Sequence, residues 1–243
     1  MELNVFVQDK MASKVAKNPA NKLRRCKTWQ SKHSNAVSSV CVCVCVCVCV
    51  CQEADVAAGP LTVTSLRERV LDSSKPIWCD QIAAVLKRRH ATRWDIRSVD
   101  DLGRQSHIKY GVLDGASTKY FFRTSTHRVY ERMWGEMYRH GGFVGTWDEG
   151  LHRVISSTDD HPWAFIGESS LLLYAARGRC DLDVVPIVGR PAIRYLSLAT
   201  PVGSSNRVRI TLAILELLEV GYIHEARAKW FLTPFTSHPI DCD

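Results

Sequence analysis

Two short stretches of the chain carry residue types that could bind a small charged molecule. In the first, the glycine-bearing turn 114–116 leads into Ser117 and Thr118, where a helical pattern begins. The start of a helix presents unpaired backbone N–H groups and a partial positive charge, which suit a carboxylate. In the second, Glu168 ends an apolar run, where an acid suits an ammonium group. Together they could hold both ends of an amino acid; the alternatives are an ordinary helix N-cap and a surface acid.

The elements that would position these residues alternate between strands and helices. Apolar periodicity predicts strands over 109–113, 163–168, 182–188 and 195–200. It predicts helices over 98–105, 119–124, 126–139, 148–155, 169–177, 204–219 and 222–230. The first of these helices has Ser98 as its expected N-cap, followed by acids in the first turn. Strands that alternate with helices predict an α/β layer fold. Residues 79–89 also show helical spacing, with Ile82, Val85 and Leu86 on one face.

Composition divides the chain into unlike parts. The 243 residues allow one or two domains, and 46% hydrophobic with 23% charged residues is typical of a globular protein. Much of the formal charge of +7 lies near the N-terminus, where residues 1–36 predict a basic, disordered tail. No aromatic ladder or zinc spacing accompanies this charge, so we expect no nucleic-acid partner. Residues 37–51 are a low-complexity Val-Cys repeat, shorter than the roughly 20 residues of a membrane-spanning helix.

Several kinds of chemistry lack support in the sequence. Outside the repeat, the cysteines Cys26, Cys79, Cys180 and Cys242 show no CxxC spacing, so we expect no structural metal site. The cluster of His161 with its preceding aspartates 159–160 is interpreted as a polar turn before a strand. Hydrolase, nucleotide and dinucleotide motifs are missing, so we expect no enzyme activity, catalytic residue or cofactor. The first residues also lack the pattern of a secretory signal.

The segment from Ser98 to Phe231 resembles a known family. Its motifs are SVDDLGRQSHIKYGVLDGASTKYFF, VYERMW, EGLHRV, AFIGES, ATPVGSS and LAILELLEVGYIHEARAKWF, in the family's order. They resemble the second ligand-binding segment of ionotropic glutamate receptors. The acid of the FIGES motif is Glu rather than Asp, which favours the AMPA and kainate branches. The first binding segment, the pore helices and the last membrane helix are not recognisable in this chain.

The resemblance implies a fold and a domain organisation. Residues 98–231 would form one α/β lobe of a clamshell like that of periplasmic binding proteins, followed by a C-terminal tail over 232–243. Residues 54–66 (ADVAAGPLTVTSL) resemble the family's passage from the third membrane helix into this segment. Because the family has only a few residues between these two points, residues 52–97 are expected to be an irregular linker or insertion, with an insertion or unspliced sequence over 65–95.

The resemblance also implies site residues. Ser117 and Thr118 would hold ligand carboxylates, Glu168 would hold the α-ammonium group, and Ser169 and Leu172 would line the same pocket. The family's pocket tyrosine falls on Leu196, and Tyr195 is shifted by one position, so which of the two faces the pocket stays open. A disulfide between Cys180 and Cys242 is the pairing that the family pattern implies, with two free thiols as the alternative.

A partial receptor subunit is therefore the leading functional hypothesis. The resemblance implies L-glutamate or a related amino acid as ligand and other receptor subunits as partners, since the family forms tetramers. It also implies the plasma membrane, including the postsynaptic membrane, with the ligand-binding domain on the extracellular face. Two alternatives remain: a soluble amino-acid-binding protein, and a non-functional fragment or mispredicted product, because a two-base repeat would encode the Val-Cys run.

Overall fold

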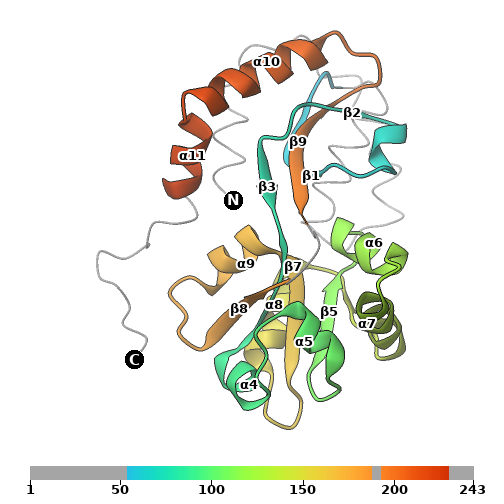
Figure 1. Cartoon of the computed structure of the whole chain (residues 1–243), viewed down its shortest axis with the longest axis vertical. Helices are drawn as coiled ribbons and strands as arrows, with labels where there is room; N and C mark the ends of the chain where they lie inside the picture. The colour runs from blue at the N-terminus through green and yellow to red at the C-terminus, as the bar shows by residue number, and fades with distance from the viewer. Residues whose placement is uncertain (1–53, 188–192, 230–243) are drawn as a thin grey trace, which may run out of the picture. The chain divides into compact units, whose positions relative to one another are not determined.

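The computed structural model of the chain describes residues 54–187 and 193–229 (Figure 1). The predicted basic tail, the Val-Cys repeat and the C-terminal tail lie outside the described residues. The described chain divides into two compact units: residues 54–79 with 195–229 form unit 1, and residues 80–187 with 193–194 form unit 2. Each unit combines a sheet with helices, which confirms the predicted α/β class.

Unit 2 is built on a five-stranded sheet in the order β6-β5-β7-β4-β8. The strands are β4 (Ile82–Lys87), β5 (Lys109–Leu113), β6 (Phe143–Val144), β7 (Trp163–Glu168) and β8 (Leu182–Pro186). β5 runs parallel to both β6 and β7, whereas β4 runs antiparallel to its neighbours β7 and β8. The carboxyl ends of β5 and β7 and the amino end of β4 therefore meet at one edge of the sheet.

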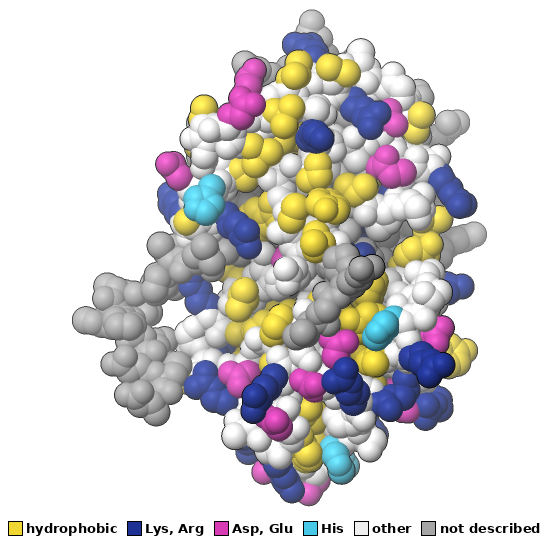
Figure 2. All heavy atoms as spheres, in the orientation of Figure 1, with side chains coloured by type: hydrophobic (Ala, Val, Ile, Leu, Met, Phe, Trp, Pro, Cys, Tyr) yellow, Lys and Arg dark blue, Asp and Glu magenta, His cyan; other side chains and the backbone are white. Residues whose placement is uncertain are grey.

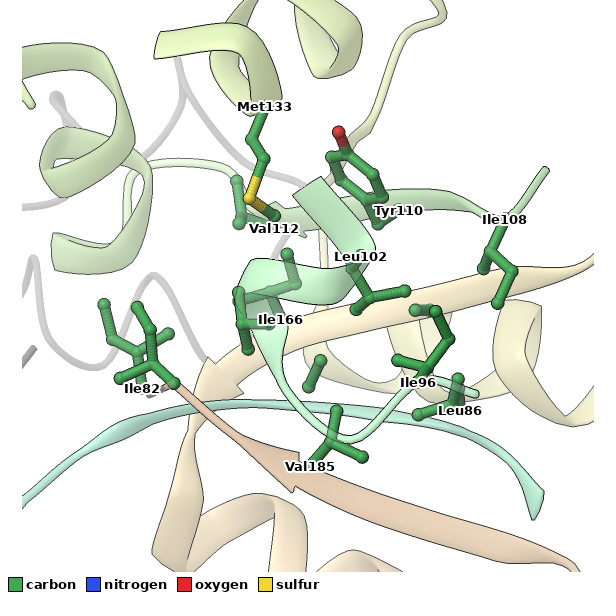
Figure 3. Packing of buried hydrophobic residues seen from close by; sticks show 14 of the residues in the cluster. Ile82, Leu86, Ile96, Leu102, Ile108, Tyr110, Val112, Met133, Ile166 and Val185 are labelled. Carbon is green, nitrogen blue, oxygen red and sulfur yellow. The ribbon is translucent and has the colours of Figure 1, made fainter. Parts of the chain in front are cut away.

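Helices cover both faces of this sheet. They are α4 (Arg88–Arg93), α5 (Val99–Arg104), α6 (Ser117–Thr124), α7 (Arg128–Arg139), α8 (Trp147–Ser156) and α9 (Ser169–Ala176). On one face, Leu102 of α5, Phe122 of α6 and Met133 of α7 belong to the larger hydrophobic cluster, part of which Figure 3 shows. On the other face, Val154 of α8 and Leu172 of α9 belong to a second cluster. The helices on the two faces thus hold the sheet, and with it the ends of its strands, in place.

The prediction for the segment that forms β4 was wrong. Residues 52–97 were expected to be irregular and 79–89 helical, but Ile82–Leu86 are fully buried in the middle of the sheet. A strand that is covered on both faces is apolar at every position, so its sequence lacks the alternation that identifies a half-exposed strand. Alternate residues of β4 enter the two clusters, as Ala84 and Val85 illustrate. The segment is therefore part of the core of unit 2.

Unit 1 contains a smaller, four-stranded sheet around β9, to which β1 and β2 run antiparallel. Its elements are β1 (Ala57–Thr62), the short 3₁₀ helix η1 (Arg67–Arg69), β2 (Asp72–Ser73), β3 (Trp78–Asp80), β9 (Arg194–Thr200), α10 (Asn206–Glu219) and α11 (Tyr222–Arg227). β9 pairs with β1, β2 and β3. Residues 195–229 thus cluster with 54–79 instead of completing the lobe predicted over 98–231. The long-range pairing of β9, which no local pattern reveals, accounts for this difference.

Helix α10 leaves much of its apolar surface exposed. Val208, Leu212, Leu217 and Leu218 are all exposed, and Ile214 is the buried residue of this helix. Hydrophobic side chains accordingly gather over unit 1 on the face that Figure 2 shows, whereas charges of both signs cover much of unit 2. Within the described ranges, no helix combines the length and apolar character needed to cross a membrane.

Local capping agrees with the sequence where the sequence carries a clear signal. Ser98 is the N-cap of α5, and its hydroxyl accepts a hydrogen bond from the Asp101 backbone N–H at 3.2 Å. Thr146 caps α8 in the same way through Glu149 N–H at 3.1 Å. β5 and β7 have the predicted bounds, and the helices α5 to α9 of unit 2 begin and end within two residues of expectation, whereas α4 was not predicted.

Two histidines of unit 2, the buried His90 and the half-buried His140, have pKa values lowered by burial. His90 is fully buried, and its Nε2 lies 3.1 Å from Asp159 Oδ1. Burial lowers the pKa of His90 below its usual value, against the opposing effect of the Asp159 hydrogen bond. Burial also lowers the pKa of His140, whose two ring nitrogens are buried without a hydrogen-bond partner.

We expect the free energy of unfolding to fall as the pH is lowered from about 7.5 to about 5.5. In the unfolded chain the two histidines bind protons with a pKa near 6.5, and in the folded chain they bind protons less readily. Protonation therefore favours the unfolded chain, so the folded state keeps its full stability above this pKa and loses stability below it. Urea unfolding at each pH measures the effect. His90→Gln should reduce the pH dependence, whereas the exposed His152→Gln should not. Equal stability of the parent at both pH values would contradict this expectation.

We expect Leu86→Ala to lower the free energy of unfolding of unit 2 by about 2–5 kcal/mol, because it opens a cavity in a central strand. Equilibrium urea unfolding followed by tryptophan fluorescence measures the loss. Leu173→Ala is the matched control, since Leu173 is exposed on α9 and should change stability by no more than about 0.5 kcal/mol. A Leu86 variant as stable as the parent would show that β4 is not part of the core.

Candidate ligand-binding site

The candidate site lies where two neighbouring parallel strands end. β5 and β7 are paired in register, with Gly111 beside Phe165 and Val112 beside Ile166. β5 is followed by a turn and α6, and β7 runs directly into α9. Helices that start beside one another at the carboxyl edge of a sheet commonly frame ligand sites in α/β proteins. Gly111 itself allows this packing, because a Cβ there would lie 2.2 Å from the Gly142 carbonyl oxygen.

The turn before α6 is held by its own side chains. Asp114 Oδ1 accepts hydrogen bonds from Gly115 N–H at 2.8 Å and from Lys119 Nζ at 2.7 Å. Gly115 has a φ of 72°, a left-handed conformation that favours glycine. The N-cap position of α6 is Ala116, which has no side chain able to cap the helix. Ser117 and Thr118 follow directly as its first residues, and both are buried. They therefore do not act as the N-cap.

The structure brings three of the four predicted ligand-binding residues to one place. Ser117 Oγ donates to Glu168 Oε1 at 3.4 Å, although the two residues are 51 positions apart. Thr118 adjoins Ser117 in the first turn of α6. The start of a helix and a carboxylate are thus adjacent. That Ser117, Thr118 and Glu168 bind a molecule with an acidic and a basic end stays a prediction.

The fourth predicted residue, Ser169, has a hydrogen-bonding partner of its own. Its hydroxyl donates to Asp80 Oδ1, and the backbone N–H of Ser170 lies 3.2 Å from both Asp80 carboxylate oxygens. The N–H of Ser169 donates to the Gln81 carbonyl at 2.7 Å. The first donors of α9 are therefore engaged within the protein. Leu172, expected to line the pocket, is instead fully buried in the second hydrophobic cluster.

Arg194 is a member of the site that sequence reasoning missed. Its guanidinium lies over the ring of Phe121 from α6, with 4.7 Å between the guanidinium carbon and the ring centroid. Burial lowers the pKa of Arg194, and the negative charge of Glu168 partly opposes that shift. Its Nε and Nη2 atoms are buried and have no hydrogen-bond partner in the described structure. A single arginine 26 residues from Glu168 in the sequence carries no local signal of this role.

Other residues considered from sequence lie elsewhere. Tyr195 is 47% exposed on β9, while the neighbouring Leu196 is half-buried and pairs with Thr62 in unit 1. Asp159 contacts His90 and also Arg89, at 3.2 Å, whereas His161 is exposed in a bend. The interpretation of this segment as a polar turn agrees with that arrangement.

The arrangement supports binding by charge. Helix α6 begins without a side-chain cap, and its positive end suits a carboxylate. Glu168 offers an acceptor for an ammonium group, and the half-buried Arg194 adds a positive charge over Phe121 of α6. In the part of the chain that the structure describes, no cluster of His, Cys, Asp and Glu side chains could hold a metal ion. Cys180 is disulfide-bonded, and its expected partner Cys242 lies outside the described residues.

Comparison with known proteins gives the site a context. No protein-family model matches the chain. Over 138 residues, 56% of its length, the chain is 37% identical to the ionotropic glutamate receptor kainate 1 of Rattus norvegicus. Over the same length it is 37% identical to glutamate receptor 3 of Mus musculus, and 36% identical to the ionotropic glutamate receptor kainate 4 of Rattus norvegicus. The matched segment spans only 14% to 15% of these relatives. They are receptors and not enzymes, and this chain carries a segment homologous to ionotropic glutamate receptors.

Proposed function

We propose that the chain is part of an ionotropic glutamate receptor subunit and that unit 2 contributes one lobe of an L-glutamate-binding domain. The observation that carries the proposal is the contact between Ser117 at the start of α6 and Glu168 at the end of β7. Its chemistry matches a ligand with carboxylate and ammonium groups. The named relatives, all glutamate receptors, support the same ligand class.

Each site residue has a distinct proposed role. The backbone N–H groups and hydroxyls of Ser117 and Thr118 hold a ligand carboxylate, helped by the dipole of α6. Glu168 accepts a charge-assisted hydrogen bond from the α-ammonium group, which displaces the long contact from the Ser117 hydroxyl. Ser169 adjoins Glu168 and presents its oxygen as an acceptor. Arg194 offsets the negative charge of Glu168 when no ligand is bound.

Ligand binding would act on the receptor by shifting a conformational equilibrium. A ligand that binds one state more tightly than another increases the population of that state by its difference in binding free energy. In a multi-subunit receptor of the plasma membrane, with this lobe on the extracellular face, such a shift could open a cation pore. The other subunits, the extracellular and postsynaptic location and the channel activity are all part of this proposal.

We expect Glu168→Ala to weaken glutamate binding by about 2–5 kcal/mol, because the bound ammonium group would be desolvated without a charged partner. Isothermal titration calorimetry of the full chain with L-glutamate measures the change. Glu131→Ala is the matched control, since Glu131 is exposed on α7 of the same unit and lies outside the site. If Glu168→Ala binds glutamate as tightly as the parent, the ammonium group does not bind here.

We also expect Cys180 and Cys242 to form a disulfide when the chain is produced in an oxidising compartment. Cys180 is disulfide-bonded in the structure, which supports the proposal for this half of the pair. Mass spectrometry of unreduced proteolytic peptides identifies the partner. Cys79, which is exposed and free, is the internal control and should be alkylated without prior reduction. Recovery of Cys180 in a peptide linked to another cysteine would refute the pairing.

A further inference from the structure

Asp80 is a buried acid that neither the sequence motifs nor the proposed function uses. It is 3% exposed and is the last residue of β3, separated from β4 by Gln81, at the sheet edge where β7 ends. Its carboxylate accepts hydrogen bonds from Gln81 N–H at 2.8 Å, from the Ser169 hydroxyl and from Ser170 N–H at 3.2 Å. Among the ion pairs of the described residues, none involves Asp80. A buried carboxylate without a cation needs such donors to offset its desolvation.

Asp80 and Glu168 have different roles near the start of α9: Asp80 caps the helix, and Glu168 contacts Ser117 on α6. Glu168 occupies the N-cap position of α9, yet its side chain does not cap the helix. Asp80 supplies the capping acceptor instead, from a strand 89 positions away. The Glu168 carboxylate is consequently turned toward Ser117 on α6, where its Oε1 accepts the hydroxyl at 3.4 Å. Without Asp80, the open donors of α9 would attract the Glu168 carboxylate back to its own helix.

The same contacts distinguish the starts of the two helices. At α9, Ser169 N–H is bound by the Gln81 carbonyl and Ser170 N–H by Asp80, so a ligand carboxylate meets engaged donors and a negative charge. At α6, the cap position is Ala116 and no side chain caps the helix. A carboxylate is therefore directed to α6 and an ammonium group to the α9 side, where both acids lie.

We propose that Asp80 is a positioning residue of the candidate site: by capping α9 it holds Glu168 toward α6 and so sets the preference for a ligand that carries an ammonium group. This inference rests on the proposed function. It adds the residue that orients Glu168 and assigns Ser169 a structural link to Asp80.

The test compares L-glutamate with glutarate, which has both carboxylates and lacks the ammonium group. Calorimetry of the full chain gives the ratio of the two affinities. Asp80→Ala removes the capping oxygens, and we expect it to reduce the preference for glutamate by about tenfold or more, the equivalent of one charge-assisted hydrogen bond. Asp80→Asn keeps a capping oxygen and should retain most of the preference. If the alanine variant does not fold, Asp80→Val replaces it, because valine also lacks a capping acceptor and fills more of the space.

Two controls separate positioning from stability. Asp183→Asn removes an acid that pairs with Arg88 at 3.2 Å elsewhere in unit 2, and should leave the ratio unchanged. Asp80→Ala in a Glu168→Ala background should cause no further loss of preference, because Asp80 acts through Glu168. An Asp80→Ala chain that is less stable but keeps the parent's ratio would overturn the inference while leaving the proposed function intact. A parent chain that does not prefer glutamate would contradict the proposed function, and this inference with it.

Discussion

The pairing of β5 with β7 is the constraint on which the candidate site depends. Two strands in parallel register must end at the same edge, so the residues that follow them become neighbours whatever their separation along the chain. β4 fixes this edge further, because it pairs with β7 on one side and β8 on the other and is buried on both faces. Displacing any of these strands by one residue would turn its buried side chains to the opposite face. The same buried sheet that stabilises unit 2 therefore also places Ser117 beside Glu168.

The electrostatics of the site depend on which groups bind the backbone N–H donors at the starts of α6 and α9. The donors of α9 are engaged by Asp80 and Gln81, whereas α6 begins without a side-chain cap. Buried polar groups are usually paired, so it is unusual that two buried nitrogens of Arg194 have no hydrogen-bond partner within the described residues. Burial lowers the pKa of Arg194, the negative charge of Glu168 partly opposes that shift, and α6 begins without a side-chain cap. The electrostatics of the site therefore depend on where Asp80, Glu168 and Arg194 lie relative to α6 and α9, and not only on how many acids and bases are present.

Local signals in the sequence predicted much of unit 2. Short apolar stretches predicted β5 and β7, an N-cap predicted α5, and a turn followed by Ser117 and Thr118 marked the start of α6. Features that depend on the pairing of strands far apart in the sequence were not predicted. β4 is apolar throughout because it is covered on both faces, so its pattern resembled a helix, and the grouping of β9 with unit 1 has no local trace. The resemblance located Glu168, but Asp80 and Arg194 enter the site only through the folded sheet.

The most direct test of a ligand site between α6 and the end of β7 is to map the binding of L-glutamate on the isotopically labelled full chain by NMR. The ¹H–¹⁵N spectrum reports each backbone N–H separately and detects weak as well as tight binding. If the site is correct, the largest chemical-shift changes occur at Ser117, Thr118 and Glu168, and glutarate produces smaller changes at Glu168. If glutamate leaves these signals unchanged while shifting others, such as those of the basic segment 87–93, the ligand binds elsewhere and the site is wrong.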